Sequence, residues 1–170
     1  MKPILPLLLF ALLLTACAPA AAPTPAPAAA CPVTQPPKTD FVPPAPWPAD
    51  PPQESEFWYG DADLWTALPA DGTWPNPSYG AKFPWWSQHF DVKEDETPDL
   101  LLEAVRIPLQ GEKADAISVD NSGHATNMYH ESTEWAMLSG LELTPGCWEI
   151  TGYYRDTNLS LVLFVGDEQP

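Results

Sequence analysis

The stretch CWEITGYYRDTNLSLVLFV, residues 147–165, decides the fold of this chain. In its first half, Trp148, Ile150 and Tyr154 fall on one face of an extended backbone and polar residues fall on the other, which is the alternation of a half-buried β-strand. The last part, Leu159–Val165, is almost wholly apolar, as in a strand covered on both faces. The residues RDTN between the two halves favour a turn. The stretch therefore predicts a β-hairpin whose second strand lies inside a sheet.

Short segments of similar character occur upstream of this hairpin. They are separated by turn-forming residues such as Asp120–Gly123, and no convincing amphipathic helix is found, although Leu100–Val105 would also suit a short helix. About seven short strands predict an all-β fold, an antiparallel β-sandwich for which an immunoglobulin-like topology is favoured. The further candidate strands are Ala62–Leu68, Ala81–Trp86, Leu100–Ile107, Ala116–Val119 and Trp135–Leu143.

Proline marks where the folded domain begins. Thirteen of the 23 prolines lie between Ala18 and Pro52, and proline interrupts both helices and strand ladders. We therefore expect regular structure from the region of Ser55 onward. Residues 55–166 are long enough for one β-sandwich domain and too short for two. Residues 31–54 are expected to form a proline-rich arm that wraps this domain.

The N-terminal residues carry an export signal. Lys2 precedes an apolar run, Ile4–Leu14, and the small residues that follow lead to Cys17, which is the pattern of a lipobox. The sequence predicts a lipoprotein signal peptide over residues 1–16, and lipidation of Cys17 that attaches the chain to a bacterial membrane with its domain outside the cytoplasm. The apolar run is too short for a transmembrane helix. An ordinary secretory signal, cut at Ala18–Ala20, stays open as an alternative.

Residues 17–30 are expected to be the lipidated N-terminus and a spacer. After Cys17 they contain only alanine and proline apart from Thr24, so they have almost nothing to bury. A polyproline II rise of about 3.1 Å per residue would let this spacer hold the domain up to roughly 40 Å from the bilayer.

The charge of the chain excludes one class of partner. With 23 acidic and 7 basic residues, the formal net charge is −16, whereas a nucleic-acid partner requires a positive surface. Docking of the domain on anionic lipid headgroups is disfavoured for the same reason. The membrane contact is therefore expected to run through the lipid on Cys17. The densest acidic segment, Asp91–Asp99, is interpreted as a solvated loop.

Two cysteines remain once Cys17 is lipidated. An extracytoplasmic location permits disulfides, so we expect Cys31 and Cys147 to pair. Such a bond would pin the proline-rich arm to the last strands. Free or intermolecular thiols remain the alternative, because spacing fixes no connectivity.

Four blocks of this sequence occur together in a known group of proteins. They are CPVT (31–34), LWTALPADG (64–72), KFPWW (82–86) and GCWEITG (146–152). In this combination the chain resembles a family of uncharacterised bacterial secreted lipoproteins and β-sandwich proteins. The resemblance implies export, a compact β domain and pairing of the two cysteines, and it implies no activity. The segment 87–134 matches that group poorly.

The sequence shows no catalytic signature. It has no Gly-x-Ser-x-Gly elbow, phosphate-binding loop or His-Glu-x-x-His motif. His89, His124 and His130 could gather with Asp120 and Glu131, but their spacing is not that of a zinc or calcium site. We therefore expect no catalytic residue, no metal and no cofactor.

The tryptophans supply the candidate binding face. Because Trp85 and Trp86 are adjacent in a strand, they must point to opposite faces, and only one can enter a given core. Trp58, Trp65, Trp85 and Trp86 are the candidate ligand-facing aromatics. The competing interpretation is that they fill the core and pack against the proline rings of the arm.

The sequence thus predicts a non-enzymatic binding or structural module of the cell envelope, whose partner is an envelope or extracellular protein or glycan. One alternative is a carbohydrate-binding or hydrolase-accessory module that uses exposed tryptophans. A metal-dependent enzyme is a further alternative.

Overall fold

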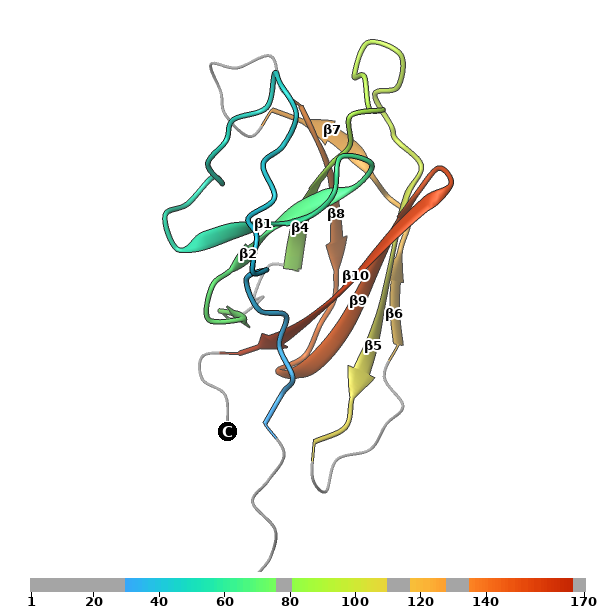
Figure 1. Ribbon diagram of the computed structural model, residues 1–170. Helices are drawn as coiled ribbons and strands as arrows, with labels where there is room; N and C mark the ends of the chain where they lie inside the picture. The colour runs from blue at the N-terminus through green and yellow to red at the C-terminus, as the bar shows by residue number, and fades with distance from the viewer. Residues whose placement is uncertain (1–29, 76–80, 110–116, 128–134, 167–170) are drawn as a thin grey trace, which may run out of the picture.

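Two β-sheets packed face to face make up the fold (Figure 1). The computed structural model describes residues 30–75, 81–109, 117–127 and 135–166, and these contain ten strands and no helix. In this part of the chain, therefore, no helix is long and apolar enough to cross a membrane. The predicted all-β sandwich is confirmed.

Each sheet has five strands. Those of the first sheet are β1 (Glu56–Gly60), β2 (Trp65–Pro69), β4 (Ala81–Trp86), β7 (His124–Thr126) and β8 (Ala136–Leu141). Those of the second are β3 (Thr73–Trp74), β5 (Leu100–Ile107), β6 (Ile117–Asp120), β9 (Gly146–Tyr154) and β10 (Thr157–Val165). The spatial orders are β1-β2-β4-β8-β7 and β3-β10-β9-β5-β6. Neighbouring strands are antiparallel except β3 and β10, which are parallel.

The strand order is that of an immunoglobulin-like sandwich. Strands β2, β4, β8 and β7 take the places of A, B, E and D, while β10, β9, β5 and β6 take the places of G, F, C and C′. The described residues form ten strands instead of the predicted seven or so, because the sequence pattern does not predict β1, β3 and β7. Strands of two and three residues, such as β3 and β7, are too short to show a period. The segment that would also suit a helix is strand β5.

The C-terminal hairpin forms as its sequence predicts. Strand β9 pairs with β10 from Gly146 opposite Val165 to Tyr154 opposite Thr157. The predicted inner face of β9 is buried, and Glu149 on the other face is exposed. Strand β10 lies between β3 and β9, and both of its faces are covered over its second half. The prediction that this strand is internal is confirmed.

The adjacent tryptophans of β4 point to opposite faces, as predicted. Trp85 lies in the core between the sheets, and Trp86 lies on the outer face of the first sheet. Opposite Trp85, β9 carries Gly152, where an added Cβ would lie 2.8 Å from atoms of the Trp85 ring. Glycine is required there because the indole occupies the space of a side chain.

The proline-rich arm covers the outer tryptophan face. Phe41 and Trp47 of the arm pack edge-on against Trp65, with ring centroids 5.8 and 5.1 Å apart. The indole nitrogen of Trp58 donates a hydrogen bond of 3.0 Å to the carbonyl of Ala49. The arm therefore wraps the domain, and its aromatic side chains cover the tryptophans on the outer face of the first sheet.

A disulfide between Cys31 and Cys147 fixes the start of the arm. Their Cα atoms lie 5.5 Å apart, and both side chains are buried with Phe164 on the outer face of the second sheet. Next to the bond, Thr34 exchanges two hydrogen bonds with the backbone of Val162, at 2.7 and 2.8 Å. The predicted pairing is present, and it joins the arm to β9 and β10.

Asp120 links the two sheets on the side where β6 faces β8. Its Oδ2 accepts hydrogen bonds from the Ser139 hydroxyl, from the Gly140 N–H at 3.1 Å and from the Ser122 hydroxyl at 2.9 Å. Burial raises the pKa of Asp120, but these hydrogen bonds outweigh it and hold the pKa below its usual value. The ionised carboxylate therefore stabilises the contact between β6 and β8.

Replacing Asp120 by alanine is expected to lower the free energy of unfolding at pH 7 by about 1–3 kcal/mol, because the buried Ser139 hydroxyl loses its acceptor. Since the pKa of Asp120 is lowered in the folded state, its stabilisation is present above about pH 4 and fades as the pH falls further. Urea unfolding at pH 7 and pH 3 measures both effects. The exposed Asp99→Ala is the control, and an equal loss at both pH values would contradict the assignment.

Candidate functional site

Three connections meet at one end of the sandwich, toward the upper right of Figure 1: the β1–β2 turn, the β4–β5 loop and the β9–β10 turn. They line a recess of about 320 Å³, which we call the tip recess. Its lining residues are Asp63 from the first connection, Ser87 and His89 from the second, and Tyr154–Thr157 from the third. Residues far apart in the sequence thus form one polar surface.

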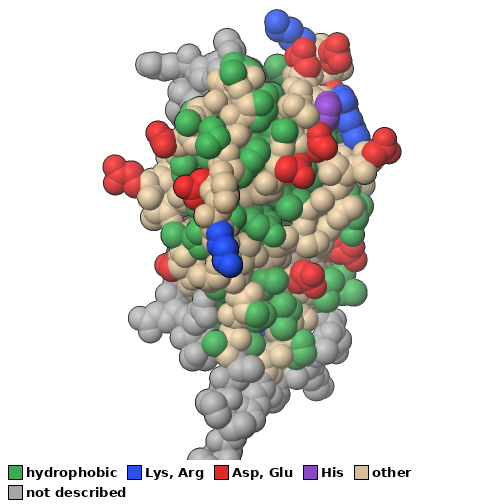
Figure 2. Space-filling view, in the orientation of Figure 1, with side chains coloured by type: hydrophobic (Ala, Val, Ile, Leu, Met, Phe, Trp, Pro, Cys, Tyr) green, Lys and Arg blue, Asp and Glu red, His purple; other side chains and the backbone are tan. Residues whose placement is uncertain are grey.

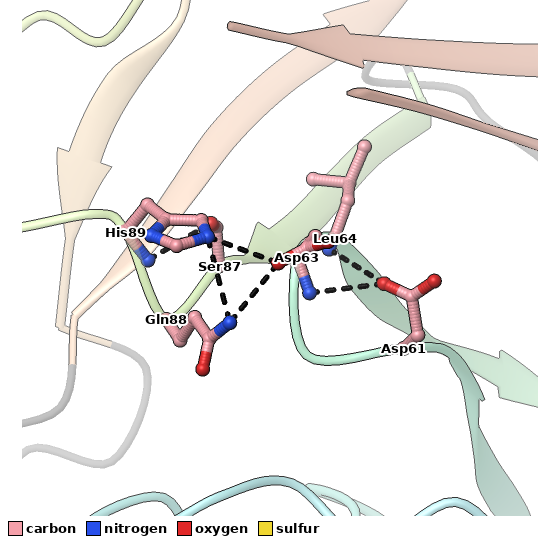
Figure 3. A network of polar contacts seen from close by, with 6 residues as sticks. All are labelled: Asp61, Asp63, Leu64, Ser87, Gln88 and His89. Atoms are coloured by element: carbon pink, nitrogen blue, oxygen red, sulfur yellow. Dashed lines mark hydrogen bonds and ion pairs between the residues drawn. The ribbon is translucent and has the colours of Figure 1, made fainter. Parts of the chain in front are cut away.

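A hydrogen-bonded pair of side chains, Asp63 and His89, forms one wall of the tip recess (Figure 3). His89 Nε2 lies 2.9 Å from Asp63 Oδ1, and Gln88 Nε2 donates to the same oxygen at 3.0 Å. Hydrogen bonds from His89 and then Gln88 hold the pKa of Asp63 below its usual value. Because an ionised carboxylate only accepts, His89 carries a proton on Nε2.

The local backbone explains why Asp63 is in this position. Asp61 Oδ1 accepts hydrogen bonds from the N–H of Asp63 at 2.9 Å and of Leu64 at 3.3 Å. This is an Asx turn, in which a short carboxylate side chain bonds backbone groups two and three residues ahead. Leu64 is buried in the core, so the turn is anchored beneath and presents Asp63 above.

The Asp63–His89 pair is open to solvent. The side chains are 55% and 50% exposed, so water screens their attraction and the pair adds little to stability. Ser87, by contrast, is fully buried, and its hydroxyl accepts a hydrogen bond of 3.1 Å from the His89 N–H. The Asp63–His89 pair therefore offers exposed hydrogen-bond donors and acceptors to a partner. Because Ser87 is buried, its hydroxyl is not accessible as a nucleophile that this pair could activate.

Arg155 also lines the tip recess, and its backbone conformation is unfavourable. Tyr154 pairs with Thr157, so Arg155 and Asp156 make a two-residue turn, and Arg155 has φ of 52°. Within the described residues it is the one non-glycine residue in the left-handed region, which costs an ordinary residue roughly 1–2 kcal/mol. Its guanidinium carbon lies 5.2 Å from the centre of the Tyr154 ring. Such an outlier is a reason to suspect a function.

The acidic segment Asp91–Asp99 belongs to the same end of the molecule. Asp91 and Asp95 each accept a hydrogen bond from the backbone two residues ahead, at 2.9 and 3.1 Å. Acidic side chains gather together with a histidine and basic side chains toward the upper right of the face shown in Figure 2. The segment is a turn-rich loop, as interpreted from the sequence, and it adds acidic side chains to this end of the molecule.

The tryptophans predicted to face a ligand do not do so. Trp58 is 4% exposed, and Trp65, Trp85 and Trp86 are fully buried. The prediction of an exposed platform at these positions is wrong, because the arm covers three of them and the second sheet covers Trp85. The competing interpretation, core filling and arm packing, is confirmed.

Among the residues that the structure describes, the candidate metal ligands are not gathered. Within the described ranges, no group of three or more His, Cys, Asp or Glu side chains is placed to hold a metal ion. His89 lies in the tip recess and His124 begins β7, while His130 and Glu131 lie outside the described residues, as does Cys17. Sequence reasoning considered His89 only as a ligand and Arg155 only as a turn residue.

Models of protein families, curated proteins and solved structures were each compared with the chain, and none matches.

Proposed function

We propose that this chain is a lipid-anchored extracytoplasmic binding module that recognises a partner, without catalysis, through its tip recess. The observation that carries the proposal is Arg155, which is kept at the tip in a backbone conformation that favours glycine. A glycine there would relieve the strain, so the arginine is best explained by what its side chain contacts.

The position of the arm indicates how the tip would be oriented relative to the membrane. The disulfide holds Cys31 at the start of β9, and the tip turn follows the end of the same strand. Eight residue steps along a strand separate the two by about 26 Å. In Figure 1, the start of the arm (blue) lies toward the bottom and the β9–β10 turn lies at the upper right. A lipid on Cys17 would therefore leave the tip facing away from the membrane.

The loops at the tip occupy a position suited to recognition. The β4–β5 and β9–β10 connections correspond to the B–C and F–G loops, which carry the binding surface in immunoglobulin variable domains. This likeness is one of fold, and the chemistry must come from the residues themselves. Here that chemistry is an arginine, an imidazole and several carboxylates, which suits a polar protein surface with mixed charge.

A photocrosslinking experiment in cells tests the proposal. A photoreactive phenylalanine at Asp156 of the full chain is expected to give a discrete cross-linked adduct, whereas the same group at the exposed Glu149, in the middle of β9, gives none. Arg155→Gly is expected to remove the Asp156 adduct while the free energy of unfolding stays the same or rises by about 1 kcal/mol. An adduct unchanged by Arg155→Gly, or one formed only from Glu149, would contradict the proposal.

A further inference from the structure

A second recess lies at the other end of the β1–β2 hairpin. It has a volume of about 480 Å³ and lies between the strand ends Glu56 and Pro69 and the short strand β3. The tip recess adjoins the opposite end of the same hairpin, where Gly60 pairs with Trp65. We call this second cavity the β3 recess, and it is separate from the tip recess. Its volume is within the range of small-molecule sites.

Trp74 is the aromatic wall of the β3 recess. It is half-buried, and its ring packs on Phe83 with centroids 4.5 Å apart, so that part of the ring is held by the core and part lines the cavity. The backbone of β3 is fixed to β10 on both sides of Thr73. The Phe164 N–H donates to the Gly72 carbonyl at 2.9 Å, and the Gly166 N–H donates to the Trp74 carbonyl at 3.0 Å. A ligand would thus meet a rigid ring.

Polar acceptors line the rest of the β3 recess. Glu56 is half-buried, and burial raises the pKa of its carboxyl group. Asp71 is oriented by the N–H of Thr73, which donates to its Oδ1 at 2.8 Å. Gln53 adds an amide and Ser55 a hydroxyl. None of the described residues that line the cavity is Lys or Arg.

This combination selects a class of ligand. Two carboxylates, with no Lys or Arg among the described lining residues, disfavour an anionic ligand, and the formal net charge of −16 adds to that repulsion. One ring on one wall is not the aromatic cage that encloses a quaternary ammonium ion. A ligand with many hydroxyl donors and an apolar ring face fits both the carboxylates and the indole. We propose that the β3 recess binds a neutral oligosaccharide, with Trp74 stacking on a sugar ring and Glu56 accepting hydrogen bonds from its hydroxyls.

Calorimetric titration of the mature full chain, in a detergent without sugar headgroups, tests the proposal. The probes are cellohexaose, chitohexaose and mannohexaose as neutral oligosaccharides, and oligogalacturonate as an anionic one. Saturable binding of at least one neutral probe is expected, without binding of oligogalacturonate. Trp74→Ala should weaken that binding about tenfold or more, and Trp74→Phe, which keeps a ring, should weaken it less.

Two further variants make the result specific. Glu56→Gln, which removes the charged acceptor, is expected to weaken saccharide binding roughly tenfold. If Trp74→Ala does not fold, this variant still tests the proposal. Glu54→Gln, two residues away and outside the β3 recess, should bind as the unchanged chain does. Arg155→Gly at the tip should also leave saccharide binding intact, so the two proposals fail separately. Binding of none of the neutral probes, or equal binding by Glu56→Gln and Glu54→Gln, would overturn the inference.

Discussion

Replacing Cys31 and Cys147 together by serine is expected to lower the free energy of unfolding by about 5 kcal/mol, the largest stability effect we predict. The disulfide spans a sequence separation of 116 residues, and in the chain-entropy model a cross-link stabilises by restricting the unfolded chain, more so for longer loops. Typical domains are stable by only 5–15 kcal/mol in all, as a rough range. The double variant should therefore be marginally stable.

Urea unfolding of the oxidised chain, the reduced chain and the double variant measures this effect. The reduced chain and the double variant should agree, because both lack the same bond. The hydrogen bonds of Thr34 to Val162 and the packing of Phe41 on Trp65 remain available to both. A difference below about 1 kcal/mol between oxidised and reduced chain would show that these contacts, and not the covalent bond, hold the arm.

Replacing Cys17 by serine is expected to abolish lipid anchoring of the chain. The predicted lipobox requires the thiol as the acceptor of the lipid, and stable anchoring in turn requires more than one acyl chain. Labelled palmitate should therefore be incorporated into the unchanged chain and not into Cys17→Ser. On fractionation, the variant should leave the lipid-anchored pool, either as released chain or as uncleaved precursor.

The Cys31→Ser/Cys147→Ser variant is the matched control for this experiment, because it changes thiols and leaves Cys17 in place. It should incorporate palmitate as the unchanged chain does. If Cys17→Ser is processed and located like the unchanged chain, the alternative cleavage at Ala18–Ala20 is correct and the lipid anchor is not.

Much of the sandwich could be predicted because its long strands show clear alternation of apolar and polar residues or continuous apolar runs. The bounds of β4 and β5 agree with the sequence prediction, and β9 and β10 differ from it by one or two residues. Because successive side chains of a strand point to opposite faces of the sheet, the sequence also predicts that Trp85 and Trp86 lie on opposite faces. It does not predict what covers Trp86, since Phe41 and Trp47 lie in a segment without strand periodicity.

The candidate site was harder to predict for a different reason. Asp63, His89 and Arg155 lie in three connections, and only the closure of both sheets brings them together. No short motif encodes such a distant arrangement. Aspartate is a turn-forming residue type, but the presentation of Asp63 to His89 by the turn at Asp61 depends on the neighbouring loop. The strain at Arg155 depends on the register of the hairpin, which pairs Tyr154 with Thr157.

The pairing of Cys31 with Cys147 also sets an order of events if the chain is exported as its lipobox pattern predicts. A chain threaded outward from its N-terminus delivers Cys31 well before Cys147. Throughout that interval the first cysteine has no correct partner, and β3 likewise waits for β10, the last strand. Under that prediction, the domain can be completed only when nearly the whole chain has crossed the membrane, and the disulfide can form only late in export.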